Sequence, residues 1–200
     1  MGSQQLTKSS INIFQVTPAN LPVGANSYSL PTLSVDVSGI PFKPAPFLID
    51  FSNDYSVVWG KSCINAVTGK ACSTSPTDLL TSYVNSSAAI GTFNNMMFGG
   101  YNVSGNIYYD ELILPTSGIA RIIPLYEANT VYQDLWQYGV SSATYGILGF
   151  GPLSSLWSAY VNPNTATATY AIALSPTTTS SNAVTASITI GATLQSSYIG

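Results

Sequence analysis

The sequence predicts an all-β protein, and three observations lead to that prediction. Short runs rich in Val, Ile, Tyr, Phe and Thr are separated by clusters of Gly, Pro, Asn and Ser along most of the 200 residues. Thr185 to Ile190 alternates polar and apolar residues, which is typical of a strand with one buried face. No repeat of fixed period and no break in composition divides the chain. We therefore expect one domain of closed or sandwiched antiparallel sheets, with one or two short helices.

The β-type runs define the expected strands in chain order. They are Thr32 to Val37, Phe47 to Phe51, Ser56 to Trp59, Ala89 to Met97, Gly105 to Leu114, Ile119 to Tyr126 and Thr185 to Ile190.

Two short helices are expected in the second half of the chain. Thr130 to Tyr138 has apolar residues at helical spacing and is followed by Gly139, a common residue after a helix. Leu153 to Val161 repeats this pattern. Ser175 to Ser187 is rich in Ser and Thr and predicts an exposed hairpin loop.

Composition excludes several classes of function. Only 6% of the residues are charged, the net charge is −3, and no basic run is present, so we expect no nucleic-acid partner. Because the chain has no His, Ser-His and Cys-His nucleophilic mechanisms are excluded, and any hydrolysis has to use carboxylates. We expect no cofactor and no metal site. No apolar stretch reaches 18 residues, so no membrane span is predicted.

The two cysteines and two sequons bear on the compartment. Cys63 and Cys72 flank a segment with a Thr-Gly-Lys turn, and they form either a disulfide or a pair of free buried thiols. Asn85-Ser86-Ser87 and Asn102-Val103-Ser104 are acceptor sequences for N-glycosylation. These features favour an extracellular, secretory or vacuolar protein. Met1-Gly2-Ser3 is interpreted as a tag remnant, which would leave an original signal peptide unseen.

Asp50 is the residue that most needs an explanation. It ends the apolar run that begins at Phe47, and a short polar turn and more β-formers follow it. Burying an ionised carboxylate is costly unless hydrogen bonds compensate for it. Asp50 is therefore either a turn residue that accepts backbone N–H bonds or a catalytic acid at the end of a buried strand.

Several motifs resemble those of pepsin-like aspartic peptidases. Leu48-Ile49-Asp50, followed by a turn and Val57-Val58-Trp59, is similar to the family's first catalytic strand and turn. Tyr145-Gly146-Ile147-Leu148-Gly149-Phe150-Gly151 resembles the family's hydrophobic-Gly motif, a strand that passes beneath the active-site turn. Ile188 to Ala192 and Ser196 to Gly200 are similar to the segment that closes the N-terminal lobe.

Two further features agree with this family in order and spacing. Cys63 and Cys72 lie where it has a small disulfide loop, and Phe98 to Asp110 resembles its flap hairpin. The resemblance implies that residues 28–200 form a single pepsin-like N-terminal lobe. Residues 1–27 are then an N-terminal extension or tag remnant plus a first strand.

The family's mechanism implies a second carboxylate. Its enzymes have two lobes that each deliver one Asp, and the sequence given stops where the second lobe is expected to begin. No other acidic residue has a setting like that of Asp50. We interpret Asp36 and Asp110 as strand residues, Asp54 as part of the turn, and Asp78 and Asp134 as loop or helix-start residues.

The active-site turn departs from the family's Asp-Thr-Gly. Phe51 replaces a Thr whose hydroxyl bonds to the other lobe, and Ser52 replaces a Gly whose N–H reaches the carboxylate. The Ser52 hydroxyl is itself a candidate to bond to Asp50. Asn53 replaces the Ser or Thr that orients the carboxylate.

The flap departs as well. Phe98 occupies the position of the family's flap Tyr, with Tyr101 as a substitute if the hairpin register differs, so both are candidate substrate-binding residues. Tyr145 stands where the family often has Asp.

Together these departures predict a non-catalytic pepsin-like protein that acts in extracellular binding, inhibition or structure. The alternative is an aspartic endopeptidase in which Asp50 pairs with an Asp from another lobe, another chain or a symmetry mate. The expected partners are a polypeptide or protein ligand, and a second lobe or a homo-oligomer.

Overall fold

A computed structural model describes most of the chain. The described residues are 12–23, 26–40, 44–72, 83–98, 101–114, 120–132, 145–160, 170–176 and 184–190. Within these ranges the chain forms ten strands and one short helix. They are β1 (Asn12–Val23), β2 (Asn26–Val37), β3 (Ala45–Asp50), β4 (Ser56–Asn65), β5 (Gly91–Phe98), β6 (Tyr101–Ile113), β7 (Ala120–Val131), β8 (Gly146–Gly149), α1 (Ser155–Tyr160), β9 (Tyr170–Pro176) and β10 (Val184–Ile190).

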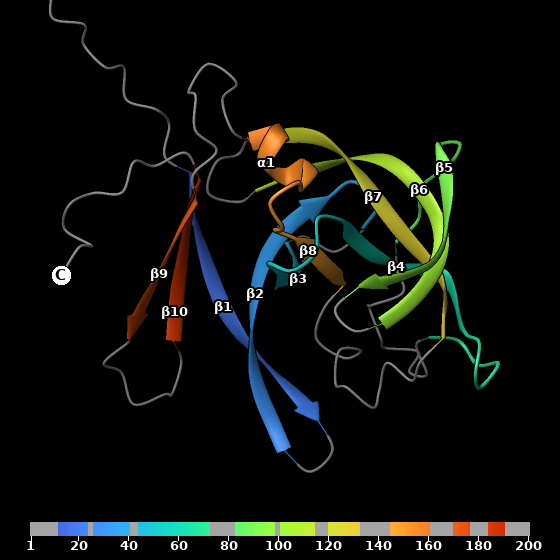
Figure 1. Cartoon of the computed structure of the whole chain (residues 1–200), viewed down its shortest axis with the longest axis horizontal. Coiled ribbons are helices and arrows are strands. Elements are labelled where there is room, and N and C mark those ends of the chain that lie inside the picture. Colours follow the sequence, from blue (N-terminus) through green and yellow to red (C-terminus); the bar gives the residue numbers. More distant parts are fainter. Residues whose placement is uncertain are drawn as a thin grey trace, which may run out of the picture.

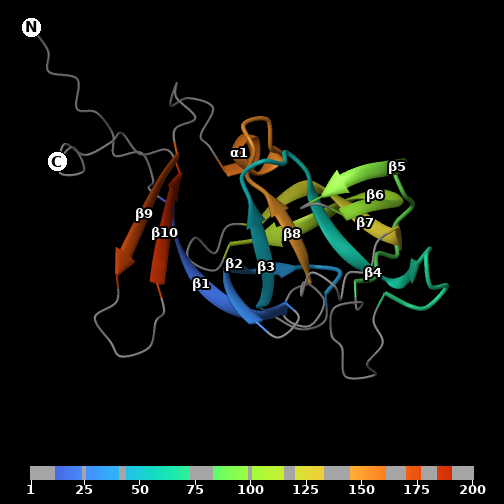
Figure 2. The same ribbon diagram turned by 60° about the horizontal axis from the view of Figure 1, so that its bottom comes forward.

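The strands are joined edge to edge in the order β5-β6-β7-β4-β8-β3-β2-β1-β10-β9. A further pairing of β2 with β6, at Asp36↔Ile113 and Val37↔Leu112, closes β6, β7, β4, β8, β3 and β2 into a ring. β1, β10 and β9 extend from this ring as a three-stranded ribbon (Figures 1 and 2). The predicted all-β class and the closed arrangement are therefore confirmed.

The expectation of antiparallel sheets is wrong for two pairs of strands. β3 pairs in parallel with β8, and β4 pairs in parallel with β7. Parallel neighbours require long crossover connections, and here the hairpin of β5 and β6 lies in the chain between β4 and β7. A short apolar run does not reveal the direction of its partner strand.

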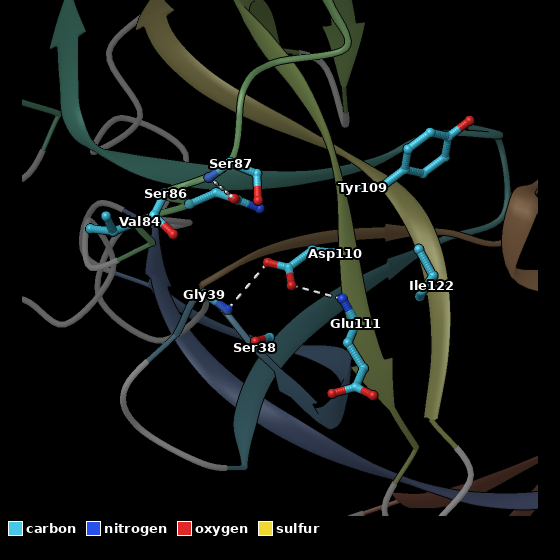
Figure 3. A pocket seen from close by; sticks show the side chains of 10 residues that line it. Ser38, Gly39, Val84, Ser86, Ser87, Tyr109, Asp110, Glu111 and Ile122 are labelled. Carbon is cyan, nitrogen blue, oxygen red and sulfur yellow. Dashed lines mark hydrogen bonds between the residues drawn. The ribbon is translucent and has the colours of Figure 1, made fainter.

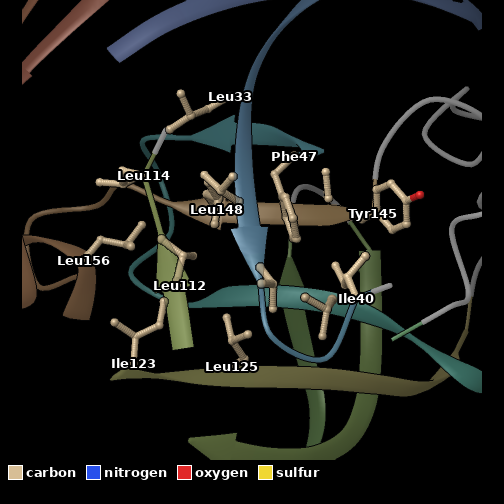
Figure 4. Packing of buried hydrophobic residues seen from close by; sticks show 14 of the residues in the cluster. Leu33, Ile40, Phe47, Leu112, Leu114, Ile123, Leu125, Tyr145, Leu148 and Leu156 are labelled. Atoms are coloured by element: carbon tan, nitrogen blue, oxygen red, sulfur yellow. The ribbon is translucent and has the colours of Figure 1, made fainter. Parts of the chain in front are cut away.

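Two hydrophobic cores lie on opposite sides of β3, β4 and β8. Phe47, Val58 and Leu148 belong to the cluster drawn in Figure 4, whereas their neighbours Leu48, Val57 and Ile147 belong to the second cluster. Successive side chains of a strand point to opposite faces. These strands are therefore buried on both faces, which is why their sequences read as continuous apolar runs.

The predicted helix at 130–138 is wrong in its first residues. Thr130 and Val131 end β7, where they pair with both β4 and β6. Both residues are β-branched, which favours strands, and Val131 is fully buried there. Residues 133–144 lie outside the described residues.

The predicted helix at 153–161 is confirmed over Ser155–Tyr160. The Ser154 hydroxyl accepts a hydrogen bond from Leu156 N and so caps the first turn. The hairpin predicted around 175–187 is also confirmed, but its loop is shorter. Ser175 and Pro176 belong to β9, and Val184 to Ser187 belong to β10, because the two strands pair from Tyr170↔Ile190 to Pro176↔Val184.

Every predicted strand coincides with an observed one, and most observed strands are longer. β2 begins at Asn26 and β4 continues to Asn65. Each strand extends beyond its most apolar residues because backbone pairing with β1 or β7 continues there. The strand expected within 1–27 is β1. Residues 1–11 and 191–200, including the segment from Ser196 to Gly200, lie outside the described residues.

Candidate functional site

Asp50 is the last residue of β3 and lies beside β8. The two strands pair in parallel with Asp50 opposite Gly149, and Phe150 N donates a 2.7 Å hydrogen bond to the Asp50 carbonyl oxygen. A Cβ at Gly149 would lie 2.4 Å from the Tyr55 carbonyl oxygen, so only glycine allows this close approach. The hydrophobic-Gly stretch thus runs directly alongside the candidate catalytic strand.

The Asp50 carboxylate is held by one neighbour, Ser52. Both Ser52 N, at 2.8 Å, and Ser52 Oγ, at 2.6 Å, donate to Asp50 Oδ1. The predicted hydroxyl contact is therefore confirmed, and the side chain of Ser52 does not prevent its N–H from reaching the carboxylate. Asp50 Oδ2 is buried and has no hydrogen-bond partner among the described residues. Such a group destabilises a fold unless something outside this part of the chain satisfies it.

Asn53 fastens the turn instead of orienting the carboxylate. Its Oδ1 accepts a 3.0 Å hydrogen bond from Tyr55 N, which closes an Asx turn. Its Nδ2 donates a 2.9 Å hydrogen bond to the Met97 carbonyl oxygen, near the end of β5. The turn after β3 is therefore joined directly to the β5–β6 hairpin.

The segment that follows β8 wraps onto the same turn. Gly151 N donates to the Asn53 carbonyl oxygen at 2.7 Å, and Leu153 N donates to Asp54 Oδ1 at 2.8 Å. A Cβ at Gly151 would lie 2.4 Å from Asp54 Oδ1. Asp54, the acidic residue nearest to Asp50 in the chain, is thus occupied in holding this segment.

Phe51 lies at the surface beside this site. Its side chain is 36% exposed, and its ring centroid is 5.9 Å from that of Phe150. Met97 and Leu153, which both belong to segments bonded to the turn, are also exposed, at 57% and 84%. Apolar side chains are therefore exposed around the Asp50 turn, next to the exposed polar side chain of Ser52.

Phe98 lies in the core, not at the surface of the hairpin. It is fully buried among the rings of Tyr55, Phe93 and Tyr126, with centroid distances between 5.8 and 6.5 Å. Burial raises the pKa of Tyr126, and the neighbouring Tyr55 adds to this shift. Tyr101 pairs with Phe98 through its backbone, whereas its side chain lies outside the described part.

Tyr145, which stands just before β8, is also a core residue. It is 5% exposed, and burial raises the pKa of its phenol. Its N–H donates to the Pro46 carbonyl oxygen at 2.9 Å, and its carbonyl oxygen accepts from Trp59 N at 3.1 Å. The backbone of Tyr145 thus joins the start of β8 to both β3 and β4.

Cys63 and Cys72 form a disulfide, as predicted, with Cα atoms 5.2 Å apart. The loop between them folds back through a turn in which Asn65 Oδ1 accepts hydrogen bonds from Val67 N and Thr68 N. Gly69 has a φ of +67°, a conformation that favours glycine. Both cysteines are buried and belong to the second core.

The two sequon asparagines have different settings. Asn85 Nδ2 donates to the Tyr83 hydroxyl at 3.1 Å, and Asn85 Oδ1 accepts from Ser87 N at 2.8 Å. Asn102 is half-buried in β6, and its Oδ1 is buried without a hydrogen-bond partner in the described part.

Asp110 is a residue whose role the sequence did not reveal. It was expected to be an ordinary strand residue, yet it is 8% exposed and accepts hydrogen bonds from Gly39 N and Glu111 N, as Figure 3 shows. The only available signal is that Asp110 shares a face of its strand with Leu112, because alternate residues of a strand point the same way.

Comparison with known proteins adds no family to these observations. No protein-family model matches the chain, and a search of curated proteins finds no similar sequence. The described residues contain no helix long and apolar enough to cross a membrane. They also contain no group of three or more Cys, Asp or Glu side chains arranged to hold a metal ion.

Proposed function

We propose that this chain is a non-catalytic, pepsin-like lobe that binds polypeptide outside the cell. The setting of the carboxylates around Asp50 carries the proposal. Aspartic peptidases need two carboxylates that share a proton across a bound water. Asp50 accepts its hydrogen bonds from Ser52, and the nearest other carboxylate in the chain, Asp54, accepts one from Leu153 N. No second carboxylate in the described residues is bonded to Asp50.

The β5–β6 hairpin supports the same proposal. A flap that closes over substrate has to move relative to the active-site turn. Here Asn53 bonds this hairpin to the turn at Met97 O, and Phe98 is buried in an aromatic cluster. Phe98 also lacks the hydroxyl of the family's flap Tyr. These contacts hold the hairpin in a fixed position against the turn.

The extracellular part of the proposal rests on the disulfide. Disulfides persist in oxidising compartments and are rare in the cytosol. The apolar surface formed by Phe51, Met97 and Leu153 supports a polypeptide partner, either a second lobe or another copy of the chain.

A peptidase assay tests the proposal. The chain is incubated with unfolded casein between about pH 2 and pH 7, the range in which carboxylates titrate. We expect the same products from the wild-type chain and from Asp50→Asn. Cleavage that pepstatin inhibits and that Asp50→Asn abolishes would overturn the proposal. Cleavage that is equal in both chains comes from a contaminating protease and agrees with it.

One observation favours the alternative of an aspartic endopeptidase. Asp50 Oδ2 is buried without a partner, which is the arrangement that a carboxylate from another lobe or a symmetry mate would complete. If two copies supply the two carboxylates, the activity per chain rises with protein concentration as dimers form. Measuring casein cleavage per chain over a hundredfold dilution series distinguishes this case.

A further inference from the structure

A polar pocket of about 390 Å³ lies beside β6 and is lined by none of the residues of the Asp50 turn. Its walls are the bend after β2 at Ser38 and Gly39, the segment Val84 to Ser87, and β6 with β7 (Figure 3). Ser38 N donates to the Glu111 carbonyl oxygen, and Val84 N donates to the Gly39 carbonyl oxygen, both at 3.0 Å. The volume is within the range of small-ligand sites, about 300–1,000 Å³.

Gly39 brings two of these walls together. A Cβ at this position would lie 2.5 Å from Tyr83 Cε2 and 2.8 Å from the Val84 carbonyl oxygen. The absence of a side chain therefore lets the segment from Tyr83 pack directly against the end of β2. The pocket is built into the fold by this contact.

A fixed carboxylate contributes to the pocket. Asp110 is more than nine-tenths buried, and it accepts hydrogen bonds from Gly39 N at 3.2 Å and Glu111 N at 2.7 Å. Asn85 Nδ2 donates a hydrogen bond of 3.1 Å to the hydroxyl of Tyr83, whose buried ring lies beside Gly39. The two backbone hydrogen bonds hold the carboxylate in one orientation.

The pocket combines negative charge with an apolar rim. Glu111 adds a second carboxylate on the opposite, exposed face of β6 (Figure 3), and no Lys or Arg is among the lining residues. Val84, Tyr109 and Ile122 line it and are exposed by 52%, 59% and 72%. Ile122 lies directly across from Glu111 in the β6–β7 ladder, so an apolar side chain and a carboxylate are side by side.

We propose that this pocket binds a basic side chain, Arg or Lys, of a partner polypeptide. The guanidinium or ammonium group would pair with the exposed Glu111 carboxylate through charge-assisted hydrogen bonds, and the charge of the buried Asp110 on the other face of the strand would add to the attraction. The methylene stem and the neighbouring apolar residues of the partner would pack on Val84, Tyr109 and Ile122. The site goes beyond the proposed function, because it shares no residue with the Asp50 turn and does not depend on a pepsin-like origin.

Peptide binding to the full chain, followed by NMR of the ¹⁵N-labelled protein, tests the proposal. The probe is acetyl-Leu-Arg-Leu-amide, and its control carries citrulline, an uncharged analogue of Arg. We expect shifts at Gly39, at 84–87 and at 109–111, and binding at least about tenfold weaker for the citrulline peptide. We also expect weaker binding at high salt, since the charges are partly exposed.

Two variants complete the test. Glu111→Gln removes an exposed carboxylate without disturbing the buried network, and it should weaken binding of the Arg peptide about fivefold. Glu127→Gln removes the same charge from β7, outside both the pocket and the Asp50 turn, and should leave the affinity unchanged. Equal affinity for the Arg and citrulline peptides, shifts elsewhere on the chain, or no binding at millimolar peptide would each overturn the proposal. Asp110→Asn is less informative because it disturbs the buried network.

Discussion

Asn53 donates a hydrogen bond from Nδ2 to the Met97 carbonyl oxygen, and this single bond joins two segments 44 residues apart in the sequence. The turn after β3 and the end of the β5–β6 hairpin are thereby held together. Because Asn53 Oδ1 also accepts from Tyr55 N, its side chain is fixed at both ends. The hairpin is anchored at the point where a mobile flap would need to be free.

The first prediction concerns this anchor. Asn53→Ala should loosen the hairpin and lower the hydrogen-exchange protection of the amides at 96–98 about fivefold, which corresponds to one lost hydrogen bond of about 1 kcal/mol. Asn94→Ala, an exposed asparagine on the same strand, is the matched control. Unchanged protection in Asn53→Ala would show that the bond does not anchor the hairpin.

The second prediction concerns the disulfide. Replacing Cys63 and Cys72 by Ser should lower the free energy of unfolding by about 2–3 kcal/mol, the value expected for closing a short loop. Urea denaturation of the double variant and the wild-type chain measures this difference. Alkylation of the native chain without reductant should label neither cysteine, and two readily labelled thiols would contradict the disulfide.

The third prediction concerns pH. Burial raises the pKa of the Tyr83 phenol above its ordinary value. The hydrogen bond from Asn85 lowers this pKa, and the charge of the neighbouring Asp110 raises it further, so the net shift is upward. Below about pH 10 both the folded and the unfolded chain keep this proton, so its stabilising effect is complete. Above about pH 10 the unfolded chain loses the proton while the folded chain keeps it, so stability falls as pH rises.

Tyr83→Phe tests this directly. Above pH 10 the free energy of unfolding of the wild-type chain should fall with pH more steeply than that of the variant, by up to about 1.4 kcal/mol per pH unit. Urea denaturation at pH 9 to 11 measures both slopes. At neutral pH the substitution should cost about 1 kcal/mol, because Asn85 loses its hydrogen-bond partner. Tyr109→Phe, which removes a hydroxyl from an exposed ring, is the control. Equal slopes in the two variants would contradict the assignment.

The fourth prediction concerns self-association. Phe51, Met97 and Leu153 expose apolar area around the Asp50 turn, and only 6% of the residues are charged to oppose contact between copies. Sedimentation equilibrium at micromolar concentration should therefore give a mass above 21.0 kDa, and Phe51→Ser should reduce it. Val67→Ser, an exposed apolar residue on the disulfide loop, should have no effect. A 21.0 kDa species unchanged by Phe51→Ser would exclude a contact at Phe51.

The strands could be predicted because their residues carry local signals. β3 and β4 are runs of apolar β-formers, and β10 alternates apolar and polar residues. Thr130 and Val131 were misassigned because apolar spacing there also fits a helix. These two residues form a strand because they pair with β4 and β6, and such pairing depends on residues far away in the sequence.

The candidate site was predictable only in part. Asp50, and its contact with the Ser52 hydroxyl two residues away, follow from the local sequence. The bond from Asn53 to Met97, the burial of Phe98 and the donation of Gly39 N to Asp110 join residues separated by tens of positions. No local pattern signals such contacts, because they arise only when the ring of strands closes.

Binding of pepstatin tests the central claim most directly, because a transition-state analogue binds tightly only where a complete catalytic pair exists. Calorimetric titration of the chain with pepstatin, at about pH 3 to 5, requires no choice of substrate. We predict no saturable binding to the wild-type chain and no difference from Asp50→Asn. Saturable binding to the wild-type chain that Asp50→Asn abolishes would show a working aspartic site and contradict the account.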